Sequence, residues 1–163
     1  MCSECGLAEV YVQPGESHLA REPVILRTLL GSCVGVAFLA VSCGVGALCH
    51  PMLPVCPSVT GRGTAPRDRR HYVDFAIREL AARFDALGIA RAGITVKLFG
   101  GADVLQAFDR QARPTVGHLN CDTALRVLRE EGFEVAASSL GGTRGLNLRF
   151  NTQTGEVLVR RLH

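Results

Sequence analysis

Hydrophobic residues along the chain fall into short runs with two different spacings. Apolar runs of about four to eight residues that end at Gly or Pro are typical of β-strands, whereas apolar residues three and four positions apart are typical of helices. This pattern predicts strands at residues 8–13, 23–30, 34–41, 45–50, 94–99, 133–138, 146–150 and 157–161. It predicts helices at residues 72–87 and 119–131, each followed by a glycine.

The order of these elements indicates a layered α+β fold. Strands outnumber helices, and both helices follow the first four strands, so we expect a mixed or antiparallel sheet packed with helices on one face. The last two strands flank "NTQTG", which is typical of a hairpin turn. The 163 residues fit a single domain spanning 1–163, with residues 1–7 as a flexible N-terminal tail.

One long stretch, from Leu29 to Pro54, contains no Asp, Glu, Lys or Arg and allows two interpretations. Its length is sufficient for a helix that spans a membrane. However, Ser42, Cys43 and Gly44 form a turn-like cluster in its middle, and the flanking residues are rich in Val and small side chains. We therefore favour two buried strands joined by a tight turn, without membrane insertion.

The amino-acid composition argues against some classes of protein, including nucleic-acid-binding and disulfide-rich proteins. Hydrophobic residues make up 47% of the chain and charged residues 20%, which is sufficient for a substantial core. The net charge of +3 is small, and the two Tyr and seven Phe are scattered, so we do not expect nucleic-acid binding. Seven cysteines at irregular spacings argue against a disulfide framework and favour a reducing, cytoplasmic location.

Cys33 is a candidate nucleophile. It follows Gly31 and Ser32 between two predicted strands, where a Gly-Ser turn lets the backbone approach a substrate and leaves amide N–H groups free. Free N–H groups of this kind can stabilise an oxyanion. The alternative is that Cys33 simply fills the core, because free cysteines are among the most buried residues.

His50 ends the second strand of the predicted hairpin, so the hairpin would bring it beside Cys33. An imidazole there can accept the thiol proton, and the resulting imidazolium lowers the pKa of the thiol. A Cys–His pair is sufficient for acyl transfer through a thioester. The alternative is a histidine that only hydrogen-bonds to the backbone at the end of a strand.

Other candidate sites are weaker. A zinc site could combine Cys2 and Cys5 with Cys49 and Cys56, but no second closely spaced cysteine pair exists. Cys43, Cys49 and Cys56 could equally be redox-active or buried. The sequence "FGGAD" lacks the Lys and Ser/Thr of a phosphate-binding loop.

Six segments, in order, carry a resemblance to a known family. They are "TLLGSCVGVAF", "HPMLP", "HYVDFAIREL", "KLFGGADVL", "VGHLNCDTALRVLREEGF" and "LGGTRGLNLRFNTQTGEVLVR", and the match around them runs from about residue 8 to residue 161. The chain resembles the CheD family, the chemoreceptor glutamine deamidases of bacterial chemotaxis. Relatives in that family have a fold similar to the catalytic domain of cytotoxic necrotizing factor toxins.

The resemblance implies an activity and a set of site residues. Family members hydrolyse glutamine side chains on chemoreceptors to glutamate and ammonia through a cysteine thioester, without metal or other cofactor. The family's catalytic residues fall on Cys33, His50 and Thr28, although Arg27 could occupy the position of the threonine.

The same resemblance extends to the substrate site and to partners. It places Gly31, Ser32 and Asn120 at the substrate-binding or oxyanion site, where Asn120 matches the family's Asn and either holds a loop or lines the cleft. It implies that the cytoplasmic domains of chemoreceptors are the substrates and that a CheC-type phosphatase is a partner. The alternative function is a non-catalytic chemotaxis adaptor that binds receptors or that phosphatase.

Overall fold

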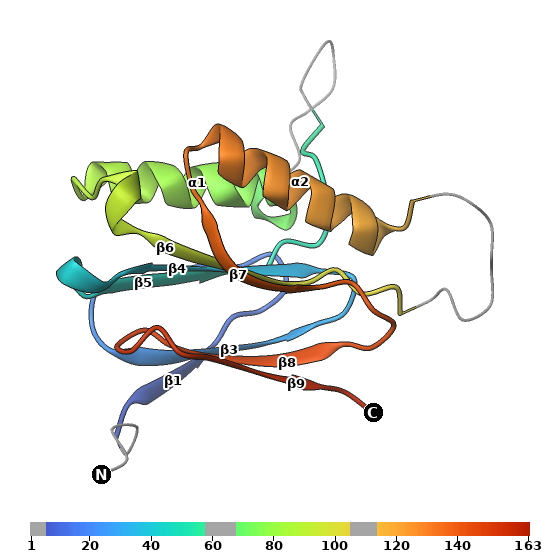
Figure 1. Ribbon diagram of the computed structural model, residues 1–163, viewed down its shortest axis with the longest axis horizontal. Coiled ribbons are helices and arrows are strands. Elements are labelled where there is room, and N and C mark those ends of the chain that lie inside the picture. The colour runs from blue at the N-terminus through green and yellow to red at the C-terminus, as the bar shows by residue number, and fades with distance from the viewer. Residues whose placement is uncertain (1–5, 58–67, 105–113) are drawn as a thin grey trace.

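The structure is a computed structural model that describes residues 6–57, 68–104 and 114–163. It has three layers, with two helices over a five-stranded sheet and a four-stranded sheet below (Figure 1). The sheets have the strand orders β2-β5-β4-β6-β7 and β1-β3-β8-β9. The strands are β1 Ala8–Tyr11, β2 Ser17–Ala20, β3 Val24–Leu30, β4 Val34–Ala40, β5 Val45–Cys49, β6 Thr95–Gly100, β7 Val135–Leu140, β8 Leu146–Asn151 and β9 Val157–Arg161; the helices are α1 Val73–Ala86 and α2 Val116–Glu130.

The long uncharged stretch forms a strand pair. Strands β4 and β5 are antiparallel and are joined by a single 3-10 turn, Val41–Cys43, followed by Gly44 in the left-handed conformation. Every residue of both strands is buried, because helices cover one face of their sheet and the second sheet covers the other. Complete burial explains why these two strands carry no charge. In the described ranges, no helix is long and apolar enough to cross a membrane.

Side chains of β4 alternate between two hydrophobic cores. Val34, Val36 and Phe38 point into the core beneath the helices, where Phe38 lies edge-on to Phe133 with ring centroids 5.3 Å apart. Ala37 and Leu39 point into the core between the two sheets. If the alternation is continued backward from β4, Cys33 faces the same side as Ala37 and Leu39, toward the core between the two sheets.

The α+β fold class is confirmed, but the strands form two sheets where the sequence indicated one. Strand β2 was not predicted, because its four residues include His18 and no clear alternation. Helix α2 begins at Val116, earlier than the spacing suggested, because Thr115 caps it by accepting a hydrogen bond from the N–H of His118. Strand β7 begins at Val135, later than the predicted start at residue 133, and Phe133 packs in the core beneath the helices.

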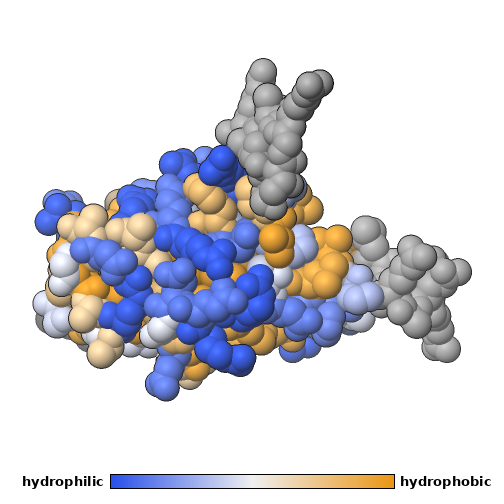
Figure 2. Space-filling view, turned by 90° about the horizontal axis from the view of Figure 1, so that it is seen from above, coloured by the Kyte–Doolittle hydropathy of each residue, from blue (hydrophilic) through white to orange (hydrophobic). Residues whose placement is uncertain are grey.

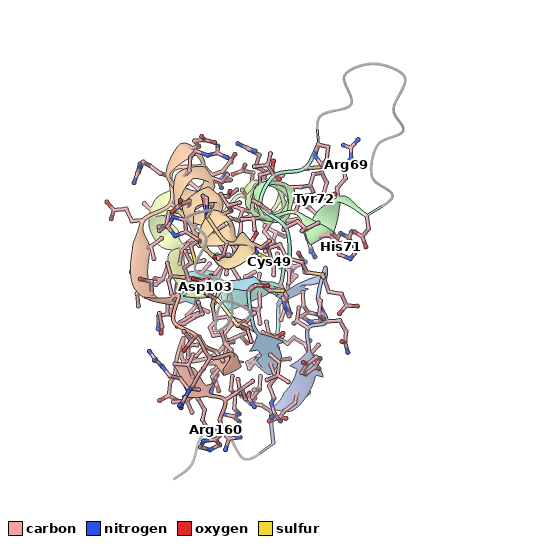
Figure 3. All side chains as sticks on the ribbon, turned by 90° about the vertical axis from the view of Figure 1, so that its right-hand side faces the viewer. Cys49, Arg69, His71, Tyr72, Asp103 and Arg160 are labelled. Atoms are coloured by element: carbon pink, nitrogen blue, oxygen red, sulfur yellow. The ribbon has the colours of Figure 1, made fainter. Side chains whose placement is uncertain are left out.

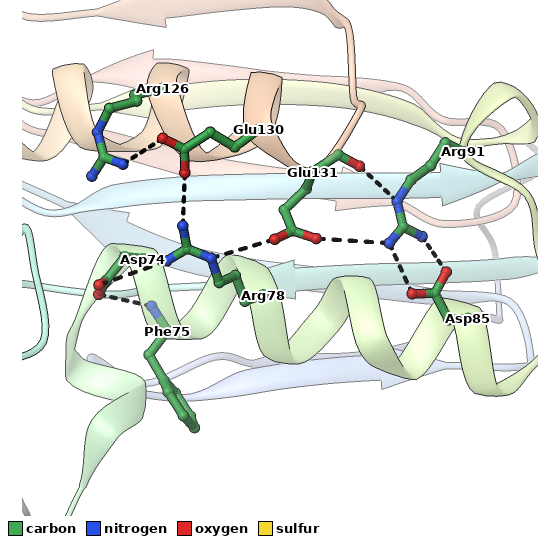
Figure 4. Close-up of polar contacts among 8 residues, drawn as sticks. All are labelled: Asp74, Phe75, Arg78, Asp85, Arg91, Arg126, Glu130 and Glu131. Carbon is green, nitrogen blue, oxygen red and sulfur yellow. Dashed lines mark hydrogen bonds and ion pairs between the residues drawn. The ribbon is translucent and has the colours of Figure 1, made fainter. Parts of the chain in front are cut away.

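Ion pairs join the two helices at one end (Figure 4). Arg78 of α1 lies 2.7 Å from Glu130 and 3.3 Å from Glu131, and Arg91 lies 2.6 Å from Asp85. The Arg78 and Glu130 side chains are more than two-fifths exposed, so each pair contributes little by itself. Arg78 joins α1 directly to the end of α2, and Arg91 lies between Asp85 and Glu131, 3.8 Å from the latter.

Candidate active site

The candidate site lies where the chain passes from one sheet to the other. Strand β3 belongs to the four-stranded sheet and β4 to the five-stranded sheet, so the connecting turn crosses between them. This turn, called here the 31–33 turn, consists of Gly31, Ser32 and Cys33. Figure 3 looks onto this end of the molecule. Cys33 is half-buried and packs against the core between the sheets.

The 31–33 turn is held through its carbonyl groups. Each of its three carbonyl oxygens accepts one hydrogen bond, and the donors are the N–H of Ala102 (2.9 Å), the Asn120 side chain (2.9 Å) and the N–H of Gly101 (2.8 Å). Within the described residues, the backbone N–H groups of the turn have no carbonyl partner. The turn therefore presents free donors beside a thiol, the arrangement that an oxyanion site requires.

Strand pairing places His50 on the same face as Cys33. Val36 lies opposite Cys49, so Gly35 lies opposite the position of His50 in the extended register. Cys33 precedes Gly35 by two residues and shares its face, which makes Cys33 and His50 diagonal neighbours. Such neighbours are about 7 Å apart between α-carbons, within reach of side chains. Gly35 has no side chain to separate them.

His50 is held by Thr28, which belongs to the other sheet. The imidazole is buried, and its Nδ1 lies 2.7 Å from Thr28 Oγ1. The Thr28 hydroxyl donates its single proton to the carbonyl of Val12, at 2.8 Å. Thr28 must then accept from Nδ1–H of His50, which assigns the proton to Nδ1 and leaves the lone pair on Nε2. That Nε2 is buried and has no hydrogen-bond partner among the described residues.

The register of β3 distinguishes Thr28 from Arg27. Leu26, Thr28 and Leu30 are all buried and face the space between the sheets. Arg27 points to the opposite face, where its guanidinium lies 2.9 Å from Glu9. Thr28 is thus the side chain of β3 that reaches the imidazole.

Burial acts on both titratable groups of the site. It raises the pKa of the Cys33 thiol and lowers the pKa of His50, because a partly desolvated environment disfavours each charged form. At neutral pH the resting pair is therefore a thiol beside a neutral imidazole. The expected lowering of the thiol pKa requires an imidazolium, whereas burial favours the neutral imidazole here.

Asn120 lies under the site on α2. Its side chain is buried, and Nδ2 donates to the carbonyls of Ser32 and Met52, each at 2.9 Å. The structure thus brings all six residues of the expected site to one end of the molecule. Sequence reasoning missed the carbonyl of Val12, because a backbone acceptor leaves no signature in the residue type.

The other described cysteines are Cys43, Cys49, Cys56 and Cys121, of which Cys121 is buried on α2 next to Asn120, with its Sγ 3.9 Å from the carbonyl oxygen of Gly100. Cys49 points into the core between its sheet and the helices (Figure 3), where burial raises its pKa to about 12. Cys43 is exposed on the β4–β5 turn, and Cys56 is half-buried. Cys2 and Cys5 fall outside the described residues. Within the described ranges, no three His, Cys, Asp or Glu side chains are grouped to hold a metal ion.

Two solved structures share the fold. They are YlmD from Geobacillus stearothermophilus (TM-score 0.51, 16% identity) and the hypothetical protein YfiH from Bacillus licheniformis (TM-score 0.52, 11% identity). The likeness covers 77% and 78% of this chain and about half of each of those chains, 50% and 51%. At this level of identity it concerns the fold alone.

Sequence comparison gives a closer relationship. A family model described as "CheD chemotactic sensory transduction" matches residues 52–161. A probable chemoreceptor glutamine deamidase CheD 2 from Geobacter sulfurreducens is 45% identical over 96% of this chain and 92% of its own length. A probable chemoreceptor glutamine deamidase CheD from Oleidesulfovibrio alaskensis is 36% identical over 99% of this chain and 76% of its own. The chain therefore belongs to the CheD family.

Proposed function

We propose that this protein deamidates glutamine side chains of chemoreceptors to glutamate and ammonia, through a thioester on Cys33. The names of the Geobacter and Oleidesulfovibrio relatives support the substrate and the overall reaction. The observation that carries the mechanism is the bond between Thr28 and His50. It leaves a basic Nε2 on the face of the sheet that Cys33 shares.

The first half of the reaction forms the thioester. His50 Nε2 accepts the Cys33 thiol proton while the sulfur attacks the amide carbon of the glutamine, forming a C–S bond. Free N–H groups of the 31–33 turn stabilise the negative charge that develops on the amide oxygen. The imidazolium then gives its proton to the amide nitrogen, the C–N bond breaks and ammonia leaves.

The second half regenerates the enzyme. A water molecule gives a proton to His50 Nε2 and attacks the thioester carbon. The C–S bond breaks, the imidazolium returns its proton to the sulfur, and glutamate is released. Thr28 holds Nδ1 protonated throughout, so Nε2 always faces the reacting atoms. Apart from the substrate and the water molecule, every group in this scheme belongs to the chain itself.

The surface beside the site suits a protein substrate. Hydrophilic residues cover most of the two helices, whereas hydrophobic surface gathers toward the end at which α2 begins (Figure 2). The exposed apolar residues near that end are Met52, Leu53, Val116 and Leu119. Such a cluster is typical of a surface that contacts another protein. It supports the cytoplasmic domain of a chemoreceptor as the substrate and is compatible with a CheC-type phosphatase as a further partner.

The test is ammonia release from purified cytoplasmic fragments of chemoreceptors. We expect release by the wild-type protein and by Cys43→Ala, whose exposed cysteine lies on the turn at the other end of the hairpin. Cys33→Ala should release none, and mass spectrometry should find glutamate in place of glutamine only with the active proteins. Full activity of Cys33→Ala would refute the mechanism. Receptor binding without any release would favour the adaptor function.

A further inference from the structure

The side chain of Asn120 joins the two chain segments that carry Cys33 and His50. Its Nδ2 donates one hydrogen bond to the carbonyl of Ser32 and a second to the carbonyl of Met52, each 2.9 Å long. Ser32 directly precedes Cys33, and Met52 follows His50 by two residues. One buried amide group therefore spans the gap between the candidate nucleophile and the candidate base.

The orientation of this amide is fixed by its partners. Both partners are carbonyl oxygens, which can only accept, so the NH₂ group must face them. Its two N–H bonds are both used, and neither is available to an oxyanion. The Asn120 Oδ1 atom is buried and has no partner among the described residues. The contacts thus favour a role that differs from direct binding of the substrate.

Two glycines let α2 approach closely enough for this contact. A Cβ atom at Gly117 would lie 2.6 Å from the carbonyl oxygen of Gly101, and a Cβ atom at Gly101 would lie 2.9 Å from that of Gly117. Gly117 and Asn120 are three residues apart and share a helix face. Gly101 also donates its N–H to the carbonyl of Cys33. The Gly-Gly turn and the Gly-x-x-Asn helix start therefore form a single support under the site.

We propose that Asn120 is a positioning residue that sets the separation between Cys33 Sγ and His50 Nε2. This inference rests on the proposed deamidase mechanism. Without Asn120, the two segments would be joined at this point by the Val34 N–H bond to the carbonyl of Pro51, which is long at 3.3 Å. A displacement of about 1 Å in a reacting pair can slow a reaction by about 100-fold.

The test compares three variants at a temperature at which each remains folded. In Asn120→Ala the bridge is absent, and in Asn120→Asp a carboxylate of the same shape faces two carbonyl oxygens. Asn151→Ala is the matched control, because Asn151 is equally buried and hydrogen-bonds only within the β8–β9 turn, away from the site. We expect kcat to fall by about 10- to 100-fold in both Asn120 variants with KM nearly unchanged. Asn151→Ala should keep its kcat.

A second measurement does not depend on deamidation. The rate of Cys33 alkylation by iodoacetamide, followed peptide by peptide, reports whether His50 assists the thiol. We expect His50→Ala to slow alkylation in the wild-type background and to have no effect in the Asn120→Ala background. An equal effect of His50→Ala in both backgrounds would overturn the positioning role.

The two measurements separate two different failures. If the wild-type protein releases no ammonia but the coupling of His50 to Cys33 depends on Asn120, the deamidase proposal is wrong and the positioning role stands. If the wild-type protein is active and the Asn120 variants match Asn151→Ala in kcat, the positioning role is wrong.

Discussion

Thr28 lies on β3 of the four-stranded sheet and His50 directly follows β5 of the five-stranded sheet, and the hydroxyl of Thr28 lies 2.7 Å from the imidazole Nδ1 of His50. Because the hydroxyl gives its own proton to the carbonyl of Val12, it acts on the imidazole as an acceptor. A neutral acceptor fixes the tautomer of the ring without adding a charge to stabilise an imidazolium. This agrees with the lowered pKa of His50.

Removal of the Thr28 hydroxyl should slow the chemical step. Thr28→Val keeps the shape of the side chain but leaves Nδ1–H with only the Val12 carbonyl, 3.5 Å away. Loss of one hydrogen bond of about 1.4 kcal/mol corresponds to about a tenfold fall in kcat. Thr28→Ser, which restores the hydroxyl, should keep most of the activity. Steady-state kinetics on receptor fragments measures both.

Arg27→Ala provides the control for Thr28. It changes the neighbouring residue, whose side chain points to the opposite face and pairs with Glu9. Its kcat should match that of the wild-type protein. A Thr28→Val variant as active as Arg27→Ala would show that the hydroxyl does not position the imidazole.

The activity should show a broad plateau with pH. The active form holds a neutral imidazole and a thiol, so kcat/KM should fall only where His50 becomes protonated or Cys33 ionises. Burial lowers the pKa of His50 from its ordinary 6.5 and raises that of Cys33 from 9.0. We therefore expect nearly constant kcat/KM between pH 6.5 and pH 9.0. If kcat/KM already fell with decreasing pH above pH 7, this assignment of protonation states would be contradicted.

Folding stability should also depend on His50 at mildly acidic pH. Its pKa is lower in the folded protein than in the unfolded chain, where it is near 6.5, so the unfolded chain binds more protons below that pH. The contribution is complete above pH 6.5 and is lost as pH falls below it. Urea unfolding at a series of pH values should show this decrease for the wild-type protein.

His50→Gln isolates this contribution, because glutamine does not titrate. The wild-type free energy of unfolding should fall more steeply than that of His50→Gln as the pH decreases from 6.5. Parallel curves for the two proteins would mean that His50 titrates equally in both states.

The contact between the Gly-Gly turn and α2 predicts a large difference between two Gly→Ala substitutions. Gly101 and Gly44 both have left-handed backbones, with φ of 69° and 63°. A Cβ atom at Gly101 would lie 2.1 Å from Cys121 Sγ, whereas one at Gly44 would meet nothing within 4 Å.

Both substitutions carry the same backbone cost, and only Gly101→Ala adds crowding. We expect Gly101→Ala to reduce the free energy of unfolding by about 1–3 kcal/mol more than Gly44→Ala. Urea denaturation of the two variants measures the difference. Equal losses would show that α2 shifts to accommodate the methyl group.

The local hydrophobic pattern was sufficient to predict most elements and to place the two candidate residues of the hairpin, Cys33 and His50, at the same end of it. The uncharged stretch predicted β4 and β5, and their pairing predicted that Cys33 and His50 share one end of it. The sequence did not distinguish Thr28 from Arg27. Both lie on one apolar strand, and the local pattern does not show which face of that strand packs against the other sheet. The division into two sheets and the short strand β2 were missed for the same reason, since both depend on partners far away in the chain.

The crossing of the chain between the two sheets affects the order in which activity and secondary structure are lost on heating. Cys33 and His50 directly flank β4 and β5 of the five-stranded sheet, while Thr28 lies on β3 and Val12 directly follows β1 of the four-stranded sheet. Sliding or partial separation of the layers would break the Thr28–His50 bond before either sheet lost its own strands. Enzymatic activity therefore depends on the packing between the two sheets. Heating should abolish the activity at a temperature at which most secondary structure still persists.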